Sequence, residues 1–439
     1  MTSMTYANNI FSSKNFEKIC LFFVYLYSLT VVPFEHVGEI SRNILIVLSI
    51  PIIFIYRKEF SKDPMVILLV LAISVQIFSW INSIIYFPEF ANQAPKIDRL
   101  AKLFTFIFLA YWLKGKKSRI YILWSFFIIG FIVGCVVHSD FTNEITKALS
   151  GHRVDFSIKN SQFTSMFASI CFLILVFILN QIRIEKSNIN VIIQFLLVST
   201  ILGAIVFSAF VIITSQSRQA WVALMISILM LPIFHTIIYK ATKATKAKGV
   251  ILVYLVLAIS LISLWQLDFI KNRVLKEHKT WNSIISGDVN HIPMSSIGIR
   301  LNSWLEASQW IKERPILGTG PETIGLVIQQ SEKFQGRLKG FGHLHNYHIE
   351  VLVSYGILGL LIIYAMYYWL AKSLLIRQQS DSNIKPFTLF SLVFIAFWSC
   401  INFFETFNGR TYGVFTHNII FAGLYTFYLT SSLKNKKEL

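Results

Sequence analysis

Long apolar runs separated by short charged segments recur along the whole chain. Continuous runs of this length predict membrane-spanning α-helices, whereas the strands of outer-membrane barrels alternate apolar and polar residues over about ten positions. The runs cover residues 18–35, 43–56, 64–87, 100–113, 120–137, 163–180, 191–214, 219–239, 250–267, 346–371, 387–405 and 412–432. We therefore predict an all-α integral membrane fold with about 12 transmembrane helices, in which residues 1–439 form a single polytopic membrane domain.

The composition supports this interpretation and excludes several classes of protein. Hydrophobic residues make up 55% of the chain and charged residues 14%, whereas soluble domains carry about 25% charged residues. An ordinary soluble enzyme is therefore excluded. The four cysteines (Cys20, Cys135, Cys171 and Cys400) form no C-x-x-C pair, so we expect no disulfide framework and no zinc site built on them. No cleavage site follows the first run, which we expect to be a retained helix.

Lysine and arginine are concentrated in alternate loops. If the N-terminus lies in the cytoplasm, every loop on the cytoplasmic side is basic, as the positive-inside rule requires. One such loop holds Lys240, Lys243, Lys246 and Lys248. The net charge of +18 would suggest nucleic acid binding in a soluble protein, but here it mostly reflects the orientation of the spans. We therefore predict that these charges set the topology rather than bind a partner, and that the protein contacts membrane lipids and no nucleic acid.

Residues 268–344 form the one long segment between predicted spans, and the charge pattern places it on the outer side, between spans nine and ten. Within it, residues 300–313 repeat apolar side chains at helical intervals, which predicts an amphipathic helix. Arg314-Pro315 should end that helix, and Gly318 to Pro321 is typical of a turn. We therefore predict a helical outer loop.

Two arginines on the outer side are candidates for anion binding. Arg218 lies in the tight connection between spans seven and eight, and Arg300 starts the predicted amphipathic helix. Two guanidinium groups can hold a diphosphate through paired, charge-assisted hydrogen bonds. The alternatives are structural: Arg218 could anchor the helix at the lipid head groups, and Arg300 could be a solvated surface residue.

Three histidines, His343, His345 and His348, gather at the mouth of span ten. A metal site is one interpretation, but no neighbouring Asp or Cys completes a ligand set, and Glu350 lies on a different helix face from His345. Buried or interfacial structural histidines are a second. The third is a general base, because the positive end of a helix dipole favours a neutral imidazole that can take a proton from a hydroxyl.

Further polar residues are expected at the outer ends of spans, where a structural role is more common than a catalytic one. They are Glu35, His36, His152, Arg153, Glu405, Arg410, His417 and Asn418. The outer segments contain no D-x-D pattern for a divalent metal, and the sequence contains no phosphate-binding loop and no G-x-S-x-G nucleophile motif. These features argue against an ATP-driven pump.

The motifs after residue 300 resemble those of one known family. His345-Asn346, followed by nine residues and Gly356-Ile357-Leu358-Gly359, resembles the H-[NSQ]-x9-G-x-x-G pattern of bacterial O-antigen ligases of the WaaL type. Arg300, Trp304 and residues 314–320 are similar to the recurring part of that family's large periplasmic loop. The specific motifs cover residues 300–359. The wider superfamily also contains O-antigen polymerases of the Wzy type and protein O-oligosaccharyltransferases.

The resemblance implies a GT-C-like transferase in the bacterial inner membrane, with its active site facing the periplasm. It implies transfer of a polysaccharide from undecaprenyl diphosphate to a sugar hydroxyl of the lipid A-core, with no metal and no other cofactor. Matched residue by residue, His345 would be the general base, and Arg218 and Arg300 would bind the diphosphate.

Three alternatives stay open. A polymerase would use the same donor but extend a glycan chain. A protein O-oligosaccharyltransferase is disfavoured, because only six residues follow Leu433 and we expect no soluble C-terminal domain. A polysaccharide transporter would typically show internal repeats and charges near the membrane midplane, whereas the polar cluster here is predicted at the outer mouth.

Overall fold

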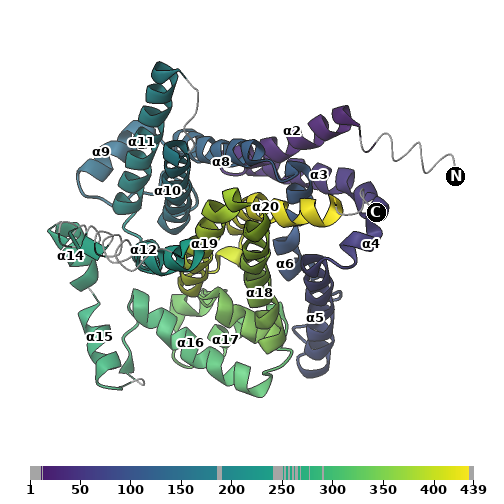
Figure 1. Ribbon diagram of the computed structural model, residues 1–439. Coiled ribbons are helices and arrows are strands. Elements are labelled where there is room, and N and C mark those ends of the chain that lie inside the picture. The colour runs from purple at the N-terminus through teal and green to yellow at the C-terminus, as the bar shows by residue number, and fades with distance from the viewer. Residues whose placement is uncertain are drawn as a thin grey trace.

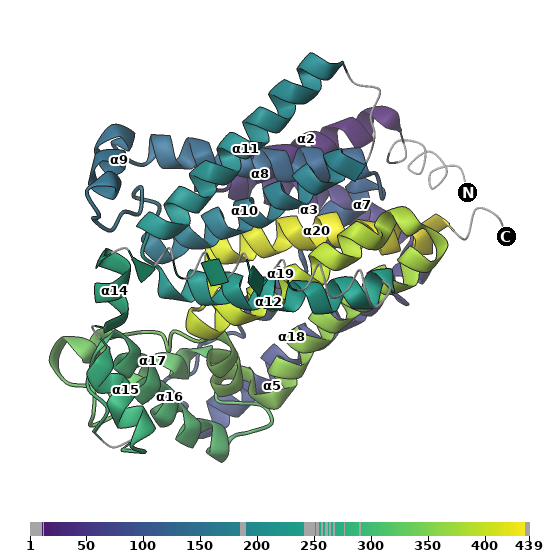
Figure 2. The same cartoon turned by 60° about the vertical axis from the view of Figure 1, so that its left-hand side comes forward.

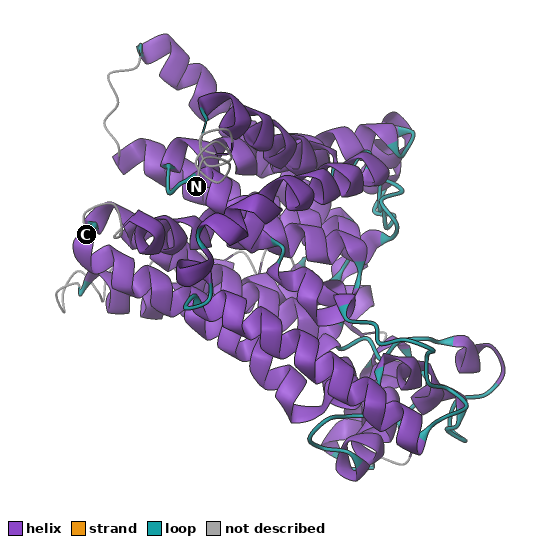
Figure 3. Cartoon of the chain, turned by 90° about the vertical axis from the view of Figure 1, so that its right-hand side faces the viewer, coloured by secondary structure: helices purple, strands orange, loops and turns teal. Residues whose placement is uncertain are grey.

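The computed structural model describes residues 11, 13–184, 190–240, 268–275, 277–288 and 291–434, with a few further residues between 251 and 266. Within these ranges the regular structure is entirely helical (Figure 3). The helices before residue 240 are α2 (Lys14–Thr30), α3 (Glu35–Ile55), α4 (Arg57–Phe60), α5 (Pro64–Tyr86), α6 (Asp98–Ala101), η1 (Lys102–Phe104), α7 (Phe106–Leu113), α8 (Lys117–Val137), α9 (Phe141–Leu149), α10 (Ser161–Ile184), α11 (Val191–Thr214) and α12 (Arg218–Tyr239).

The second half contains the long outer segment and three further long helices. Its helices are α14 (Asp268–Leu275), α15 (His278–Ile285), α16 (Ser296–Glu313), η3 (Pro321–Thr323), α17 (Ile324–Gln329), η4 (Gly336–Gly340), α18 (Tyr347–Ser380), η5 (Ser382–Ile384), α19 (Lys385–Phe404), η6 (Phe407–Gly409) and α20 (Thr411–Lys434). The predicted helix 300–313 is α16, which begins earlier because Ser295 caps it by accepting a hydrogen bond from Gly298 N.

Eight described helices are long and apolar enough to cross a bilayer: α3, α5, α8, α10, α11, α12, α18 and the stretch Ser382–Phe404 that contains α19. The chain is therefore an all-α, multi-pass integral membrane protein, as predicted, while the number twelve stays a prediction. Of the other four predicted spans, 18–35 corresponds to the 17-residue α2, and 412–432 to α20. The span predicted at 250–267 falls largely outside the described residues.

The predicted span 100–113 is divided into three short helices, α6, η1 and α7. The chain bends in this region. Polar side chains of α20 form hydrogen bonds with the backbone groups at this bend. Asn418 accepts a hydrogen bond from Phe106 N (2.8 Å) and donates one to Lys102 O (3.0 Å). His417 Nε2 lies 3.1 Å from Leu103 O, so His417 and Asn418 are structural, the more common role for such residues.

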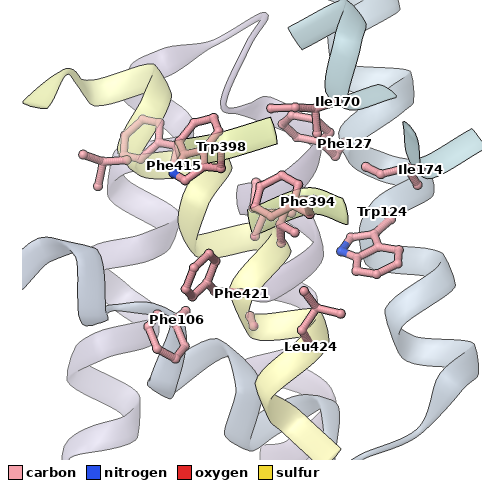
Figure 4. Close-up of a cluster of buried hydrophobic side chains, with 14 of the residues drawn as sticks. Phe106, Trp124, Phe127, Ile170, Ile174, Phe394, Trp398, Phe415, Phe421 and Leu424 are labelled. Carbon is pink, nitrogen blue, oxygen red and sulfur yellow. The ribbon is translucent and has the colours of Figure 1, made fainter. Parts of the chain in front are cut away.

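The core of the bundle is formed by aromatic and aliphatic side chains around α19 and α20 (Figure 4). Figure 1 shows α18, α19 and α20 at the centre, and their main neighbours are α5, α12 and α7, respectively. In the core, Phe394 stacks on Trp398 with ring centroids 5.7 Å apart, and Phe421 packs edge-on against Phe394 at 6.3 Å. These contacts fix the helix ends that carry the polar residues described below.

The outer segment lies at one end of the bundle, where α16 and α17 pack against each other (Figure 2). It has a small apolar cluster of its own, separate from the main core. The cluster consists of Ala307, Val327, Ile328, Phe334, Leu344 and Val353. Because Leu344 and Val353 flank the start of α18, this cluster attaches the outer segment to the bundle beside His345.

A break in α18 provides a second attachment. Gly356 has φ 60° and ψ −162°, so the helical hydrogen bonds stop there. The loop after α16 supplies partners through Thr319 N to Val353 O (2.8 Å), Gly320 N to Ser354 O (3.0 Å), Ile357 N to Pro315 O (2.8 Å) and Leu358 N to Ile316 O (3.4 Å). The backbone of the loop therefore pairs directly with the backbone of α18.

This close approach explains two of the glycines in the predicted motifs. A Cβ atom on Gly356 would lie 2.2 Å from the carbonyl oxygen of Ile316, and one on Gly318 would lie 2.5 Å from that of Val353. Both residues also have positive φ, +60° and +67°, which glycine adopts at no steric cost. The glycines thus position the loop rather than a ligand.

Candidate active site

His345 lies in the turn immediately before α18, held by hydrogen bonds on both sides. Asn346 caps the helix by accepting hydrogen bonds from His348 N (3.0 Å) and Ile349 N (3.1 Å). Leu344 N donates to Glu350 Oε1 at 2.8 Å. His345 itself has φ 52°, a left-handed conformation that costs a non-glycine residue about 1–2 kcal/mol. The surrounding contacts therefore hold the backbone of His345 in a conformation that most non-glycine residues avoid.

A carboxylate from a distant part of the chain meets this imidazole. His345 Nδ1 lies 3.1 Å from Oε2 of Glu405, which follows α19 and is 5% exposed. Burial alone would raise the pKa of Glu405, but the hydrogen bond and charge of His345 outweigh burial, and the net pKa is lowered. A carboxylate only accepts hydrogen bonds, so Nδ1 carries a proton in this contact.

His343 lies against the same pair. Its ring centroid is 4.1 Å from that of His345, and its Nε2 is 4.0 Å from Glu405 Oε1. Burial, followed by the charge of His345, lowers the pKa of His343 to about 4. His343 is therefore a neutral imidazole at neutral pH, with a lone pair available for a ligand.

Arg300 reaches this group through Gln162, the second residue of α10. In the amide orientation that satisfies both neighbours, Gln162 accepts a hydrogen bond from Arg300 Nη2 at 3.1 Å and donates one to Glu405 Oε2. The helix that carries Arg300 is also fixed to the histidine turn, because Trp304 Nε1 donates to Leu344 O at 2.9 Å. The structure thus brings His345 and Arg300 into one hydrogen-bonded group.

Arg218, at the first position of α12, is connected to the start of α16. Its Nη2 lies 3.0 Å from Glu277 Oε1, and Glu277 Oε2 accepts a hydrogen bond from the hydroxyl of Ser295 at 2.5 Å. Burial alone would raise the pKa of Glu277, but the hydrogen bonds from Ser295 and Arg218 lower it overall. Because Ser295 caps α16, Arg218 is tied to the same helix that carries Arg300.

Arg153 belongs to the neighbouring loop. Its Nε donates to Ser215 O at 3.0 Å, and Gln216 Nε2 donates back to Gly151 O at 3.0 Å. These contacts stabilise the connection that precedes Arg218.

Two further outer residues lie near the histidine turn. The positive charge of Arg410 contributes to lowering the pKa of His343. His348 Nε2 lies 3.0 Å from Ser399 O, so the third histidine of the motif joins α18 to α19.

Three of these side chains could hold a metal ion. One nitrogen each of His343 and His345 and one oxygen of Glu405 all lie within 4.8 Å of one another. The local sequence offered three histidines and no suitably placed acidic ligand beside them, since Glu405 follows His345 by 60 residues. Gln162 was missed for the same reason, because it approaches from α10, far away in sequence.

Comparison with known proteins gives one family match. The model of the family described as O-antigen ligase matches residues 203–364, from within α11 to within α18. The matched stretch includes Arg218, Arg300 and His345, whereas Gln162 and Glu405 lie outside it. No curated protein matches the chain. Residues 203–364 of this multi-pass membrane protein match the O-antigen ligase domain, which is consistent with the O-antigen ligase superfamily.

Proposed function

We propose that the protein is an O-antigen ligase that moves a polysaccharide from undecaprenyl diphosphate to a sugar hydroxyl of the lipid A-core. The observation that carries this proposal is the hydrogen-bonded group of His345, Glu405, Gln162 and Arg300 inside and beside the family domain. It joins a proton acceptor to an anion-binding side chain, which are the two functions that this reaction needs.

His345 acts as the general base. Glu405 holds the proton on Nδ1, so Nε2 is the nitrogen that takes the proton of the acceptor hydroxyl. The acceptor oxygen forms a bond to the anomeric carbon of the donor sugar, while the bond from that carbon to the diphosphate oxygen breaks. The electron pair leaves with undecaprenyl diphosphate. Atoms and charge balance without ATP, because the donor is already activated.

Arg300 and Arg218 stabilise the charge that develops on the leaving diphosphate. Paired guanidinium donors can do for a diphosphate what a divalent metal does in other transferases, so we propose a metal-independent reaction. The two arginines come from different helices that Glu277 and Ser295 connect. This connection would keep their separation constant as the substrate binds.

The proposed orientation places this end of the bundle in the periplasm and the protein in the bacterial inner membrane. The basic loops at the opposite end support it through the positive-inside rule. In this arrangement residues 268–344 are a periplasmic loop of a single polytopic membrane domain. The diphosphate then lies at the membrane surface, while the prenyl tail stays among the apolar helix faces.

The test is the lipopolysaccharide of a deletion strain complemented with wild type, His345→Ala or His291→Ala. His291 is an exposed histidine of the same outer segment, paired with Asp288 at 2.8 Å, and serves as the matched control. We expect His345→Ala to lose transfer by about 10²–10⁴-fold, the usual contribution of a general base, and His291→Ala to behave as wild type.

The form of the accumulated glycan identifies the reaction. A ligase leaves bare lipid A-core while long polymer persists on the lipid carrier. If instead the core carries a single repeat and long polymer is missing, the protein is a polymerase and the acceptor assigned above is wrong. Near-normal ligation by a stably inserted His345→Ala variant would refute the role of His345.

A further inference from the structure

We propose that His343, His345 and Glu405 form a reversible Zn²⁺ site that shuts off the enzyme when it is occupied. His343 is the residue that creates this possibility. It has no part in the transfer chemistry described above, yet its ring lies 4.1 Å from that of His345, and both face one carboxylate.

The spacing of the ligand atoms fits one ion after a small adjustment. Zn²⁺ binds imidazole nitrogen and carboxylate oxygen at about 2.0–2.2 Å, so the ligand atoms of a tetrahedral site lie about 3.3–3.5 Å apart. Here one such separation is 3.1 Å, another is 4.0 Å, and all are within 4.8 Å. The 4.0 Å separation involves His343, which lies in a loop before α18, so the proposal requires a small movement of that side chain toward Glu405.

The chemistry of the ligands selects the metal. Two imidazoles and one carboxylate suit Zn²⁺, whereas Mg²⁺ and Ca²⁺ require oxygen ligands almost throughout. Three protein ligands leave a fourth position open to water, as in other reversible or catalytic zinc sites. The positive charges of Arg300 and Arg410 act on His343 and also oppose a metal cation, so we expect weaker binding than at a structural zinc site.

Inhibition follows from which nitrogen of His345 faces Glu405. Zn²⁺ bound at Nδ1 displaces the proton from that atom, and the neutral ring then carries its proton on Nε2. The lone pair that should accept the hydroxyl proton is gone. Zn²⁺ also takes the carboxylate oxygens that orient the ring. This consequence rests on the proposed role of His345 as base, whereas metal binding itself does not.

Binding is tested on the purified full-length protein in detergent, with Zn²⁺ followed by calorimetry and Co²⁺ followed by visible absorption. We expect one ion per chain. His343→Ala and Glu405→Gln should weaken binding at least tenfold. His343→Cys should keep binding and add a thiolate-to-cobalt absorption band, because cysteine is also a zinc ligand. His291→Ala, which removes the histidine of an exposed His–Asp pair, should leave binding unchanged.

Activity is tested in the same preparations with Zn²⁺ or with a chelator. Wild type should lose transfer as Zn²⁺ is added and regain it with the chelator, whereas His343→Ala should transfer normally in both. Binding that is absent, or equal in wild type and His343→Ala, would overturn the proposed site. If the protein binds one Zn²⁺ through His343 but transfers no glycan under any condition, the proposed metal site stands and the proposed function is refuted.

Discussion

At the scale of single residues, the site is defined by how one imidazole is held. His345 keeps a left-handed backbone, its helix is capped by Asn346, and its Nδ1 faces Glu405. None of these contacts involves a substrate. They fix the direction in which Nε2 points and the atom on which the proton resides. The proposed chemistry therefore depends on the protein contacts that position His345 as well as on His345 itself.

Glu405→Gln tests this dependence. The amide is nearly isosteric but uncharged, so it no longer favours the proton on Nδ1. We expect kcat to fall by about 10²-fold, within the range that general bases contribute, with little change in the KM for the donor. Steady-state transfer by purified protein is the measurement.

Glu322→Gln is the matched control for that substitution. Glu322 is another carboxylate of the outer segment, and it pairs with Lys96 at 3.1 Å rather than with a histidine. It should leave kcat unchanged. Equal losses in the two variants would mean that any outer carboxylate matters for folding, and that Glu405 has no special role toward His345.

Glu277 gives a prediction about stability and pH. Its pKa in the folded protein is below the ordinary value of 4.5, so its ion pair with Arg218 stabilises the fold above about pH 4.5 and is lost as the pH falls further. We expect Glu277→Gln to cost about 1–3 kcal/mol at pH 7, because Arg218 and Ser295 lose a charged partner.

Thermal unfolding in detergent at about pH 7 and pH 4 checks this expectation. Wild type should lose more stability than Glu277→Gln on acidification, since the variant no longer has the carboxylate to protonate. Parallel loss in both proteins would show that the Arg218–Glu277 pair does not contribute to the acid sensitivity.

At the scale of elements, α18 combines two functions in one helix. Its first turns carry the histidine motif, and its break at Gly356 receives the loop that follows α16. The site and the loop are therefore positioned by the same ten residues. In this chain one helix therefore sets the separation between His345-Asn346 and Gly356.

Gly356→Ala should damage the protein through this break. The new Cβ would lie 2.2 Å from the carbonyl oxygen of Ile316, and the backbone conformation is one that essentially only glycine adopts. We expect a loss of about 3 kcal/mol or more, seen as a lower melting temperature and reduced transfer. Gly203→Ala in α11, where nothing lies within 4 Å, should be neutral or slightly stabilising. Equal melting temperatures would exclude the steric account.

Sequence patterns predicted several elements well and others poorly, for physical reasons. Continuous apolar runs located α5, α8, α10, α11 and α12 closely, because hydropathy reports burial in lipid. Hydropathy does not report where backbone groups find hydrogen-bond partners. The division of 100–113 into shorter helices and the break in α18 were therefore missed. Both depend on partners remote in sequence, Asn418 in one case and the loop at Pro315 to Gly320 in the other.

The same limit applies to the candidate site. The residue types and positions of Arg218, Arg300 and His345 were visible in the sequence, and the structure brings two of them into one group. Glu405 was noticed only as one polar residue among many at the outer ends. Its pairing with His345 required the packing of α18 against α19, which no local pattern specifies.

At the scale of the whole molecule, the residues of the candidate site lie together at one end of an apolar bundle. The histidine turn, the start of α12 and the outer helices are connected there, while the basic connection between α18 and α19 lies at the opposite end (Figure 2). This polarity is what a transferase acting at a membrane surface needs. The prediction at this scale concerns the side of the membrane that this end of the bundle faces.

Cysteine labelling answers that question. Ser286→Cys, on the exposed outer segment, should react with a membrane-impermeant thiol reagent in intact spheroplasts, whereas Ser382→Cys, exposed between α18 and α19, should react only after permeabilisation. Three of the four native cysteines are buried, so background labelling should be low. The reverse pattern would place the site in the cytoplasm and contradict the proposed acceptor.

The pairing of α18 with the loop at Gly318 has a consequence for genetics. Compensating mutations usually relieve a clash by shrinking the side chain on the other partner. Here an alanine at 356 would collide with the carbonyl of Ile316, which every amino acid carries. No replacement at Ile316 or Leu317 can make that oxygen smaller. A selection for suppressors of Gly356→Ala is therefore expected to return glycine at 356 itself, and the position should tolerate no second-site repair within the loop.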